Sequence, residues 1–254
     1  MDRLQGKTAL VTGGGQGIGR AICQKFAAHG ATVFVADLFP DRAQSTAELI
    51  KAAGGKAFCG HVDVAQESSV KAMVAQAVER MGSIEILVNN AGIELFKTIT
   101  DMTVEEWDRV MAVNVRGVFL CSKHVIPHMK KAGKGNIINM GSVGGYVGAP
   151  FQTVYCASKG AVHQFTKCLA LELTAANIKV NAISPGGVNT AMLDYLKQEF
   201  SKQGVDLTAA LKLQQFGGEV QPDDVADMAV FLAGDESRSV HGAALLVDGG
   251  FSAS

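Results

Sequence analysis

The chain reads TALVTGGGQGIG over residues 8–19, an apolar run that leads into a glycine-rich turn. The run 8–12 has the length and apolar content of a buried strand, and the residues from Gly17 to Gly30 have the pattern of a helix. Glycines at such a junction let the backbone turn tightly and approach a pyrophosphate, which the N–H groups and dipole of the helix N-terminus favour. A glycine-rich turn between a strand and a helix therefore predicts a dinucleotide site.

The alternation of strand and helix continues along the whole chain. We predict strands at 8–12, 32–37, 56–62, 84–89, 136–140, 178–184 and 243–247, and helices at 17–30, 41–53, 68–81, 103–131, 153–175 and 222–232. The strands are continuous apolar runs, as expected when helices cover both faces of a sheet. Repeated β-α-β units with right-handed crossovers give a doubly wound parallel sheet. The prediction is an α/β fold in which a single Rossmann-type domain spans 1–254. It has a seven-stranded, mostly parallel sheet and a substrate-loop insertion around 188–216.

Composition narrows the class of partner. Of the 254 residues, 48% are hydrophobic and 19% charged, with a net charge of −1 and scattered Lys and Arg, so we expect no nucleic-acid partner. No apolar run approaches the ~18 residues of a membrane helix, and we expect no membrane partner. The five cysteines are odd in number and form no C-x-x-C pair, which indicates reduced thiols, and the six histidines form no metal pattern. The N-terminus enters a strand without a signal peptide, so we expect a cytoplasmic protein.

Asp37 ends the second predicted strand, 18 residues past Gly19. A carboxylate at this place accepts hydrogen bonds from the adenosine ribose hydroxyls and repels a 2′-phosphate. Neither Gln16 nor Leu38 offers the cation that NADP needs. The sequence therefore favours NAD over NADP as the cofactor.

Two short segments follow the third and fourth strands, at the edge where open α/β sheets bind ligands. Asp63 and Val64 are placed to contact the adenine, and Asn90, Ala91 and Gly92 are small enough to pass beside a flat cofactor. Ordinary turn chemistry is the alternative, above all for Asp63.

Tyr155 and Lys159 stand four residues apart in a predicted helix. That spacing places a phenol and an ammonium on one helical face, with Cβ atoms about 5–6 Å apart. A cation beside a phenol lowers the pKa of the phenol, which suits proton transfer near neutral pH. The pair alone is weak evidence, because such pairs are common on solvated helix faces.

Several motifs together resemble the short-chain dehydrogenase/reductase family in its compact single-domain branch, and the resemblance covers essentially the whole chain. They are Thr12-Gly13-x-x-x-Gly17-Ile18-Gly19, Asn89-Asn90-Ala91-Gly92, Ser142, Tyr155-x-x-x-Lys159, Pro185-Gly186-x-x-x-Thr190 and Val247-Asp248-Gly249-Gly250.

The resemblance implies a catalytic role for four residues. Tyr155 would be the general acid/base, and Lys159 would lower the pKa of Tyr155 and hold the nicotinamide ribose. Ser142 would hydrogen-bond the substrate oxygen, and Asn114 would anchor a proton relay through Lys159. The chemistry implied is hydride exchange between a nicotinamide cofactor and an alcohol or ketone, for which the protein supplies position and a proton path.

The resemblance also implies the cofactor contacts. Val188 would fix the nicotinamide carboxamide through its backbone and Thr190 through its side chain, although Thr190 could equally cap the helix that follows. The predicted cofactor residues are Gly13, Gln16, Gly17, Ile18, Gly19, Asp37, Asp63, Val64, Asn90, Ala91, Gly92, Tyr155, Lys159, Pro185, Gly186, Val188 and Thr190.

The substrate pocket is expected between the segments after Ser142 and Gly186 and the insertion. Its predicted walls are Glu94, Val143, Gly144, Gln152, Gly187, Met192, Leu193 and Leu196. These are mostly small or apolar, which favours a neutral secondary alcohol or ketone of moderate size, cyclic and aromatic ones included.

Two other functions remain open. Relatives that reduce 3-oxoacyl thioesters on acyl carrier protein tend to use NADPH and to carry arginines where this chain has Ile126 and Leu171. A non-catalytic NAD-binding protein is the third possibility, and the complete set of four catalytic residue types argues against it. The apolar helices, such as 162–173, exceed what one sheet face covers, so we expect a homotetramer or a dimer. The resemblance points to four subunits, with His163 between them.

Overall fold

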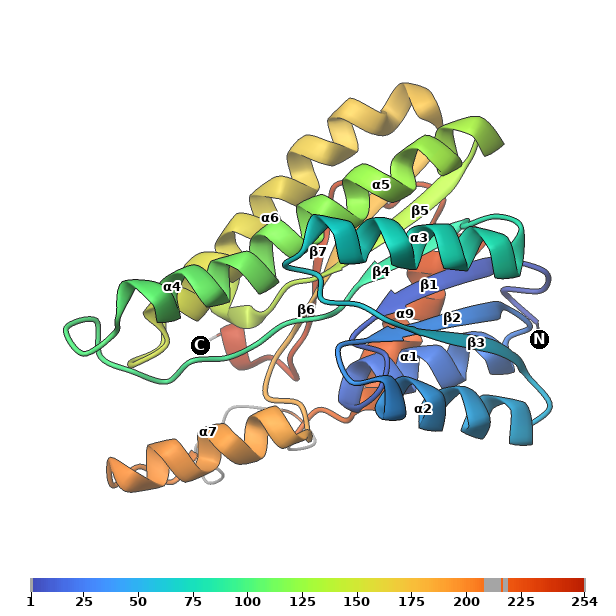
Figure 1. Ribbon diagram of the computed structural model, residues 1–254. Coiled ribbons are helices and arrows are strands. Elements are labelled where there is room, and N and C mark those ends of the chain that lie inside the picture. Colours follow the sequence, from blue (N-terminus) through green and yellow to red (C-terminus); the bar gives the residue numbers. More distant parts are fainter. Residues whose placement is uncertain (1, 208–215, 217–218, 254) are drawn as a thin grey trace.

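The computed structural model describes residues 2–207, 216 and 219–253, and its centre is a seven-stranded sheet (Figure 1). The strand order is β3-β2-β1-β4-β5-β6-β7, and each pair of neighbouring strands is parallel. The predicted doubly wound α/β fold is therefore confirmed. The strands are β1 (Thr8–Thr12), β2 (Thr32–Asp37), β3 (Lys56–His61), β4 (Ile86–Asn89), β5 (Gly135–Met140), β6 (Ile178–Pro185) and β7 (Ala244–Val247).

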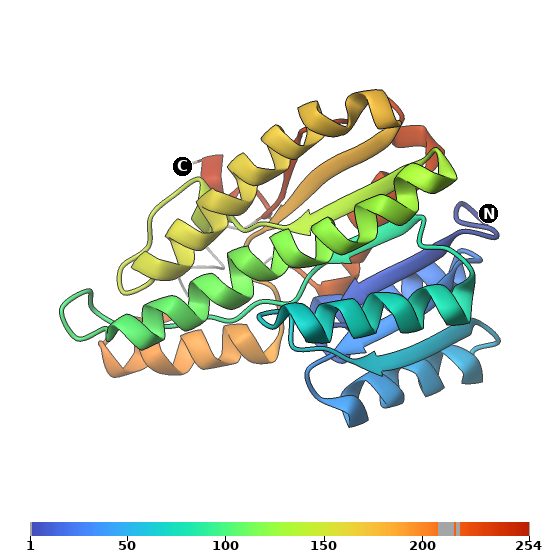
Figure 2. The same cartoon turned by 45° about the horizontal axis from the view of Figure 1, so that its top comes forward.

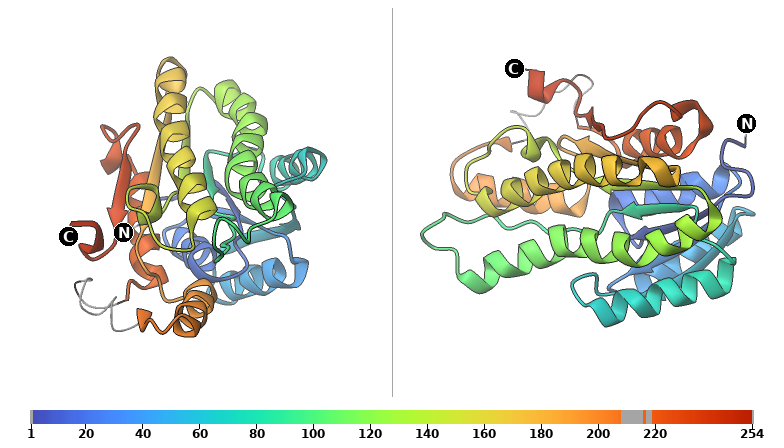
Figure 3. Two further views of the ribbon diagram at one scale, coloured as in Figure 1. Left: turned by 90° about the vertical axis from the view of Figure 1, so that its left-hand side faces the viewer. Right: turned by 90° about the horizontal axis from the view of Figure 1, so that it is seen from above.

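Helices cover both faces of the sheet (Figure 3). One layer holds α1, α2 and α9, and the other holds α3, α5 and α6. Their bounds are α1 (Gly17–Ala28), α2 (Pro40–Ala52), α3 (Glu67–Met81), α5 (Gly117–Ala132), α6 (Thr153–Leu173) and α9 (Pro222–Ala233). Neighbouring strand residues face opposite layers: Val11 packs toward α1 and Leu10 toward α3. Burial on both faces explains why the strands read as unbroken apolar runs.

The helix predicted at 103–131 is interrupted. It consists of α4 (Val104–Met111), a π-helical turn at Ala112–Arg116 and α5. Thr103 begins α4 with a capping box, because its side chain accepts from the Glu106 N–H while the Glu106 carboxylate accepts from the Thr103 N–H. A π-helical turn inside a helix often marks a functional position.

The strand order reverses beside β1, which has β2 on one side and β4 on the other. The connections leave the sheet in opposite directions at this point, and the gap at the carboxyl ends of the strands is where open α/β sheets bind ligands. The glycine-rich turn after β1 and the segment after β4 both reach this gap.

The predicted insertion begins with α7 (Ala191–Lys202), which lies apart from the two helix layers and at the same end of the molecule as α4 (Figures 1 and 2). Phe200 of α7 packs edge-on against Phe96, with ring centroids 4.7 Å apart. Most of the remainder of the predicted insertion, at 208–215, lies outside the described residues. None of the helices in the described part of the chain is long and apolar enough to cross a membrane.

Candidate active site

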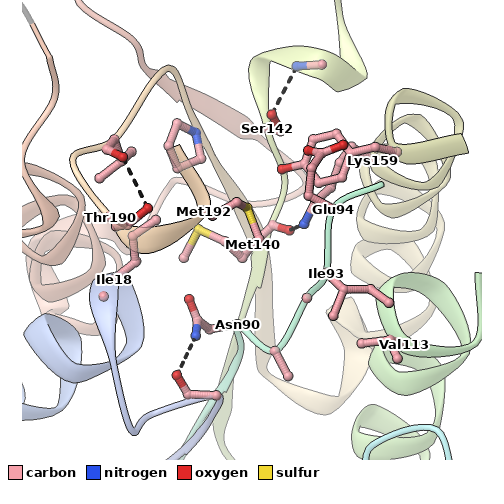
Figure 4. A pocket seen from close by; sticks show the side chains of 18 of the residues that line it. Ile18, Asn90, Ile93, Glu94, Val113, Met140, Ser142, Lys159, Thr190 and Met192 are labelled. Carbon is pink, nitrogen blue, oxygen red and sulfur yellow. Dashed lines mark hydrogen bonds between the residues drawn. The ribbon is translucent and has the colours of Figure 1, made fainter. Parts of the chain in front are cut away.

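A cleft of about 910 Å³ opens at the carboxyl ends of the strands (Figure 4). All the residues predicted to bind the cofactor and all the predicted substrate walls line it. Ser142, Tyr155 and Lys159 line it as well, whereas Asn114 lies behind its wall. The fold thus brings segments from many parts of the sequence to one cavity.

The glycine-rich turn borders the cleft beside the N-terminus of α1. Gly13 and Gly17 have φ angles of 63° and 51°, in the left-handed region that favours glycine. A Cβ on Gly19 would meet the carbonyl oxygen of Gly13 and would lie 2.5 Å from Nδ2 of Asn90. The turn therefore closes only with glycine at this place, and the approach of a pyrophosphate stays a prediction.

Asp37 is buried at the end of β2, where two backbone groups hold it. Its Oδ2 accepts from the N–H of Gly15 at 2.9 Å, and its Oδ1 accepts from the N–H of Phe39 at 3.0 Å. The sequence analysis missed one cation near Asp37. Arg42 also lines the cleft, and its guanidinium lies 4.3 Å from the ring centroid of Phe39. The position of Arg42 near the start of the helix that follows Asp37 could have indicated that its side chain reaches the cleft.

The two segments after β3 and β4 differ in what their side chains do. Oδ1 of Asp63 accepts from the N–H of Ala65 at 2.9 Å, which is the turn chemistry given as the alternative. Nδ2 of Asn90 donates to the carbonyl oxygens of Thr12 and Gly13, both at 3.0 Å. The Asn90 side chain thus braces the glycine-rich turn.

Ser142, Tyr155 and Lys159 meet at the other end of the cleft. Ser142 follows β5, and its side chain lies near enough to the Tyr155 hydroxyl to lower the pKa of that group. Oγ of Ser142 accepts from the N–H of Gly144 at 3.1 Å. Lys159 is 5% exposed, and its Nζ donates to the carbonyl oxygen of Met140 at 2.9 Å. The same Nζ lies 5.5 Å from the ring centroid of Tyr155.

Burial shapes the electrostatics of this group. Burial raises the pKa of Tyr155 above its ordinary value, and the nearby Glu94 carboxylate raises it further. Burial also lowers the pKa of Lys159 to about 8. Burial thus opposes the lowering of the Tyr155 pKa that the sequence predicts from Lys159, and that lowering stays a prediction.

Asn114 lies in the π-helical turn and clamps the segment after β4. Its Oδ1 accepts from the N–H of Ile93 and its Nδ2 donates to the carbonyl oxygen of Ile93, both at 2.9 Å. Nδ2 also donates to Oγ of Ser158 at 3.0 Å. A Cβ on Gly92 would lie 3.4 Å from Oδ1 of Asn114 and 3.7 Å from Nζ of Lys159, so both polar groups border the space that a side chain at this position would fill.

The loop after β6 joins the cofactor and substrate ends. Val188 forms an isolated parallel bridge with Val220, and Oγ1 of Thr190 donates to the carbonyl oxygen of Val188 at 3.2 Å. Thr190 stands at the N-cap position of α7, but its side chain makes no capping hydrogen bond. The helix-cap alternative is therefore right about the position and wrong about the bond.

The substrate end has more walls than predicted. Residues 147–150 line it together with Ile93, Phe200, Val205 and Leu207. Most are apolar, and Phe200 of α7 lines the cleft while its ring packs edge-on against Phe96.

His163 is 5% exposed and lies outside the cleft lining. Its Nε2 is 2.8 Å from Oγ of Ser184 in β6, and its ring packs against Tyr146 with centroids 4.5 Å apart. His163 is therefore buried within one chain, and the packing of its helix between subunits stays a prediction.

Comparisons with known proteins agree with this architecture. Residues 13–252 match a family model described as "Enoyl-(Acyl carrier protein) reductase". A cyclopentanol dehydrogenase of Comamonas testosteroni is 40% identical over 253 residues, which cover 100% of both chains. The chain belongs to the short-chain dehydrogenase/reductase family, and it is an oxidoreductase of that family.

Other family members are similarly close. A 3-oxoacyl-(acyl-carrier-protein) reductase of Thermotoga maritima is 38% identical over 248 residues, 98% of each chain. A trans-4-hydroxycyclohexanecarboxylate dehydrogenase of Sinomonas cyclohexanicum is 38% identical over 255 residues, covering 98% of this chain and 94% of its own. The crystal structure of a short-chain type dehydrogenase/reductase from Mycobacterium marinum has a TM-score of 0.93 at 34% identity, covering 100% of this chain and 98% of that one.

Proposed function

We propose that this short-chain dehydrogenase/reductase interconverts a neutral secondary alcohol and its ketone with NAD(H). One observation carries the proposal: Ser142, Tyr155 and buried Lys159 lie together at the substrate end of a cleft whose far end holds Asp37. In the direction of oxidation, alcohol and NAD⁺ give ketone, NADH and a proton.

A bound nicotinamide dinucleotide would supply the hydride acceptor and, when oxidised, a positive ring near the phenol. We propose that the O–H proton of the substrate alcohol passes to the phenolic oxygen of Tyr155. Ser142 would hold the substrate oxygen facing that oxygen. Each unit by which the pKa of Tyr155 falls corresponds to about 1.4 kcal/mol of preferential stabilisation of the phenolate. Burial raises the pKa of Tyr155. Lys159 therefore has to remain a charged ammonium when Tyr155 gives up its proton, so that it stabilises the phenolate.

Lys159 also offers a route for the proton. Gly92 leaves no side chain between Nζ of Lys159 and Oδ1 of Asn114. We propose that Asn114 anchors a proton relay in that gap, as the family resemblance implies. The two bonds from Asn114 to the backbone of Ile93 hold the segment after β4 against the π-helical turn.

The choice of NAD over NADP rests on Asp37. Two backbone N–H groups orient its carboxylate at the end of β2, where it would accept from ribose hydroxyls and repel a 2′-phosphate. Arg42 is a cation that could favour NADP, but its guanidinium lies over the ring face of Phe39.

A cyclic secondary alcohol is the substrate class we favour. The walls are mostly apolar, and two similar relatives are named for cyclopentanol and trans-4-hydroxycyclohexanecarboxylate. Turnover tests the proposal: NADH formation with a panel of cyclic and acyclic secondary alcohols, compared between the wild type and Tyr155→Phe. We expect activity in the wild type and its loss in the variant, with NADH binding retained in both. Equal inertness of two proteins that bind NADH would instead support a non-catalytic binding protein.

Reduction of 3-oxoacyl thioesters is the second candidate, because a similar Thermotoga maritima relative carries that name. Leu171 is 80% exposed on α6 in place of an arginine, and Ile126 replaces another on α5, which removes two positive contacts for an acidic carrier protein. A 3-oxoacyl thioester offered with NADPH in the same assay distinguishes the two candidates.

We further propose a homotetramer. Phe119 on α5 and Leu171 on α6 expose large apolar side chains on the outer surface of one helix layer, and burial against another copy would remove them from water.

A further inference from the structure

Two polar side chains stand out among the apolar walls of the substrate end. Glu94 follows β4 by five residues, and Gln152 directly precedes α6, so they come from different elements. Both line the cleft. In Figure 4, Glu94 lies beside Ser142 and Lys159, and therefore next to the place where the substrate oxygen would sit.

The two side chains lie near each other, because Gln152 lowers the pKa of the Glu94 carboxyl group. Oε1 of Glu94 accepts from the N–H of Leu95 at 3.2 Å. Gln152 is 9% exposed and Glu94 is half-buried, so both side chains are partly removed from bulk water. Buried polar groups are costly unless they are hydrogen-bonded, and the pair still has donor and acceptor capacity left over.

Glu94 is neutral in this environment at neutral pH. Burial raises its pKa to about 8, and only the Leu95 N–H, Lys159 and Gln152 act in the opposite direction. A protonated carboxyl group donates one hydrogen bond through its O–H and accepts through its carbonyl oxygen. Together with the Gln152 amide, the protonated Glu94 carboxyl group suits a substrate group that both donates and accepts hydrogen bonds.

We propose that Glu94 and Gln152 form a subsite for a second hydroxyl group of the substrate. This deepens the proposed function, on which it rests: the preferred alcohols are diols whose second hydroxyl lies close to the reacting carbinol. A hydroxyl both donates and accepts, as the pair requires. An ammonium group fits less well, because the Lys159 ammonium lies within electrostatic reach of Glu94 and would repel it.

The energetic consequence is discrimination against mono-alcohols. A site that hydrogen-bonds a substrate hydroxyl rejects the analogue that lacks it, because buried polar groups are then left incompletely paired. One neutral hydrogen bond to such a site gives a preference on the order of 10-fold for the substrate that makes it.

The test compares kcat/KM for cyclohexanol, the two cyclohexane-1,2-diol isomers and trans-2-aminocyclohexanol, with NAD. We expect at least one diol to be favoured over cyclohexanol by about 10-fold in the wild type. Glu94→Leu and Gln152→Leu should each bring this ratio close to one, whereas Glu94→Gln, which keeps donors and an acceptor, should keep most of it. Glu79→Leu makes the same chemical change on the exposed face of α3, away from the cleft, and should leave the ratio unchanged.

The outcomes separate this inference from the function on which it rests. A wild-type ratio near or below one, an unaltered ratio in Glu94→Leu, or a preference for the amino alcohol overturns the subsite while leaving the dehydrogenase intact. Absence of NADH formation with every alcohol, in a protein that binds NADH, overturns both. Thermal melting and NADH titration identify any variant that fails to fold, in which case Gln152→Leu and Glu94→Gln decide the matter.

Discussion

The close approach of α1 to the glycine-rich turn can be measured with two matched substitutions. Gly19→Ala and Gly160→Ala both add one methyl group inside a helix, α1 and α6 respectively. At Gly19 the methyl carbon would meet the carbonyl oxygen of Gly13 and lie 2.5 Å from Nδ2 of Asn90. At Gly160 the nearest atom is the carbonyl oxygen of Gly145 at 3.9 Å, which is ordinary contact.

The magnitudes follow from these two environments. Replacing Gly by Ala within a helix contributes about 1 kcal/mol of stability in both cases. Overlap in a well-packed place typically costs about 1–3 kcal/mol, and it applies at Gly19 alone. The neighbours there cannot move aside easily, because Asn90 is held by two hydrogen bonds of 3.0 Å to the turn itself. We expect Gly160→Ala to be about 1 kcal/mol more stable than the wild type and about 1–3 kcal/mol more stable than Gly19→Ala.

Urea unfolding gives the free energies of unfolding, and a fluorescence titration gives the affinity for NADH. We expect Gly19→Ala to bind NADH on the order of 10-fold more weakly, because a loss of 1.4 kcal/mol at the displaced turn corresponds to that factor. Gly160→Ala should bind as the wild type does. Equal stability of the two variants, together with an unaltered NADH affinity in both, would refute the reasoning about the turn.

Two further predictions concern carboxylates of the cleft. Asp37→Ala should weaken NADH binding by on the order of 10-fold or more, because hydrogen bonds to a charged group contribute about 1.5–3 kcal/mol. It should weaken NADPH binding less. Equilibrium titration with both cofactors gives the ratio of the NADH and NADPH dissociation constants, and the same ratio in the variant and the wild type contradicts the assignment. Because burial raises the pKa of Glu94 from 4.5 to about 8, the folded protein holds this proton more tightly than the unfolded chain does. The free energy of unfolding of the wild type should therefore fall as pH rises from about 4.5 to about 8. Urea unfolding at several pH values measures this dependence, and Glu94→Gln should remove the part of it that comes from this group. The same pH dependence in the variant and the wild type would contradict the prediction.

Local patterns in the sequence predicted the elements and much of the site. The apolar runs and the turn at 12–19 predicted β1 and α1, and the spacing of Tyr155 and Lys159 predicted their common helix face. The roles of these residues, and the extent of one domain over 1–254, stay predictions. The interruption between α4 and α5 was missed because it accompanies bonds between Asn114 and Ile93, which are 21 residues apart.

The sequence by itself determined the fold class and the motifs, because hydrophobic periodicity, glycine positions and helical spacing act between neighbours in the chain. Only the tertiary structure decided that burial raises the pKa of Tyr155, that Arg42 lines the cleft and that His163 is buried within one chain. It also decided that Glu94 and Gln152 lie near each other. Desolvation and side-chain pairing depend on which distant segments cover a group, and that is set only when the sheet, its helices and α7 pack together.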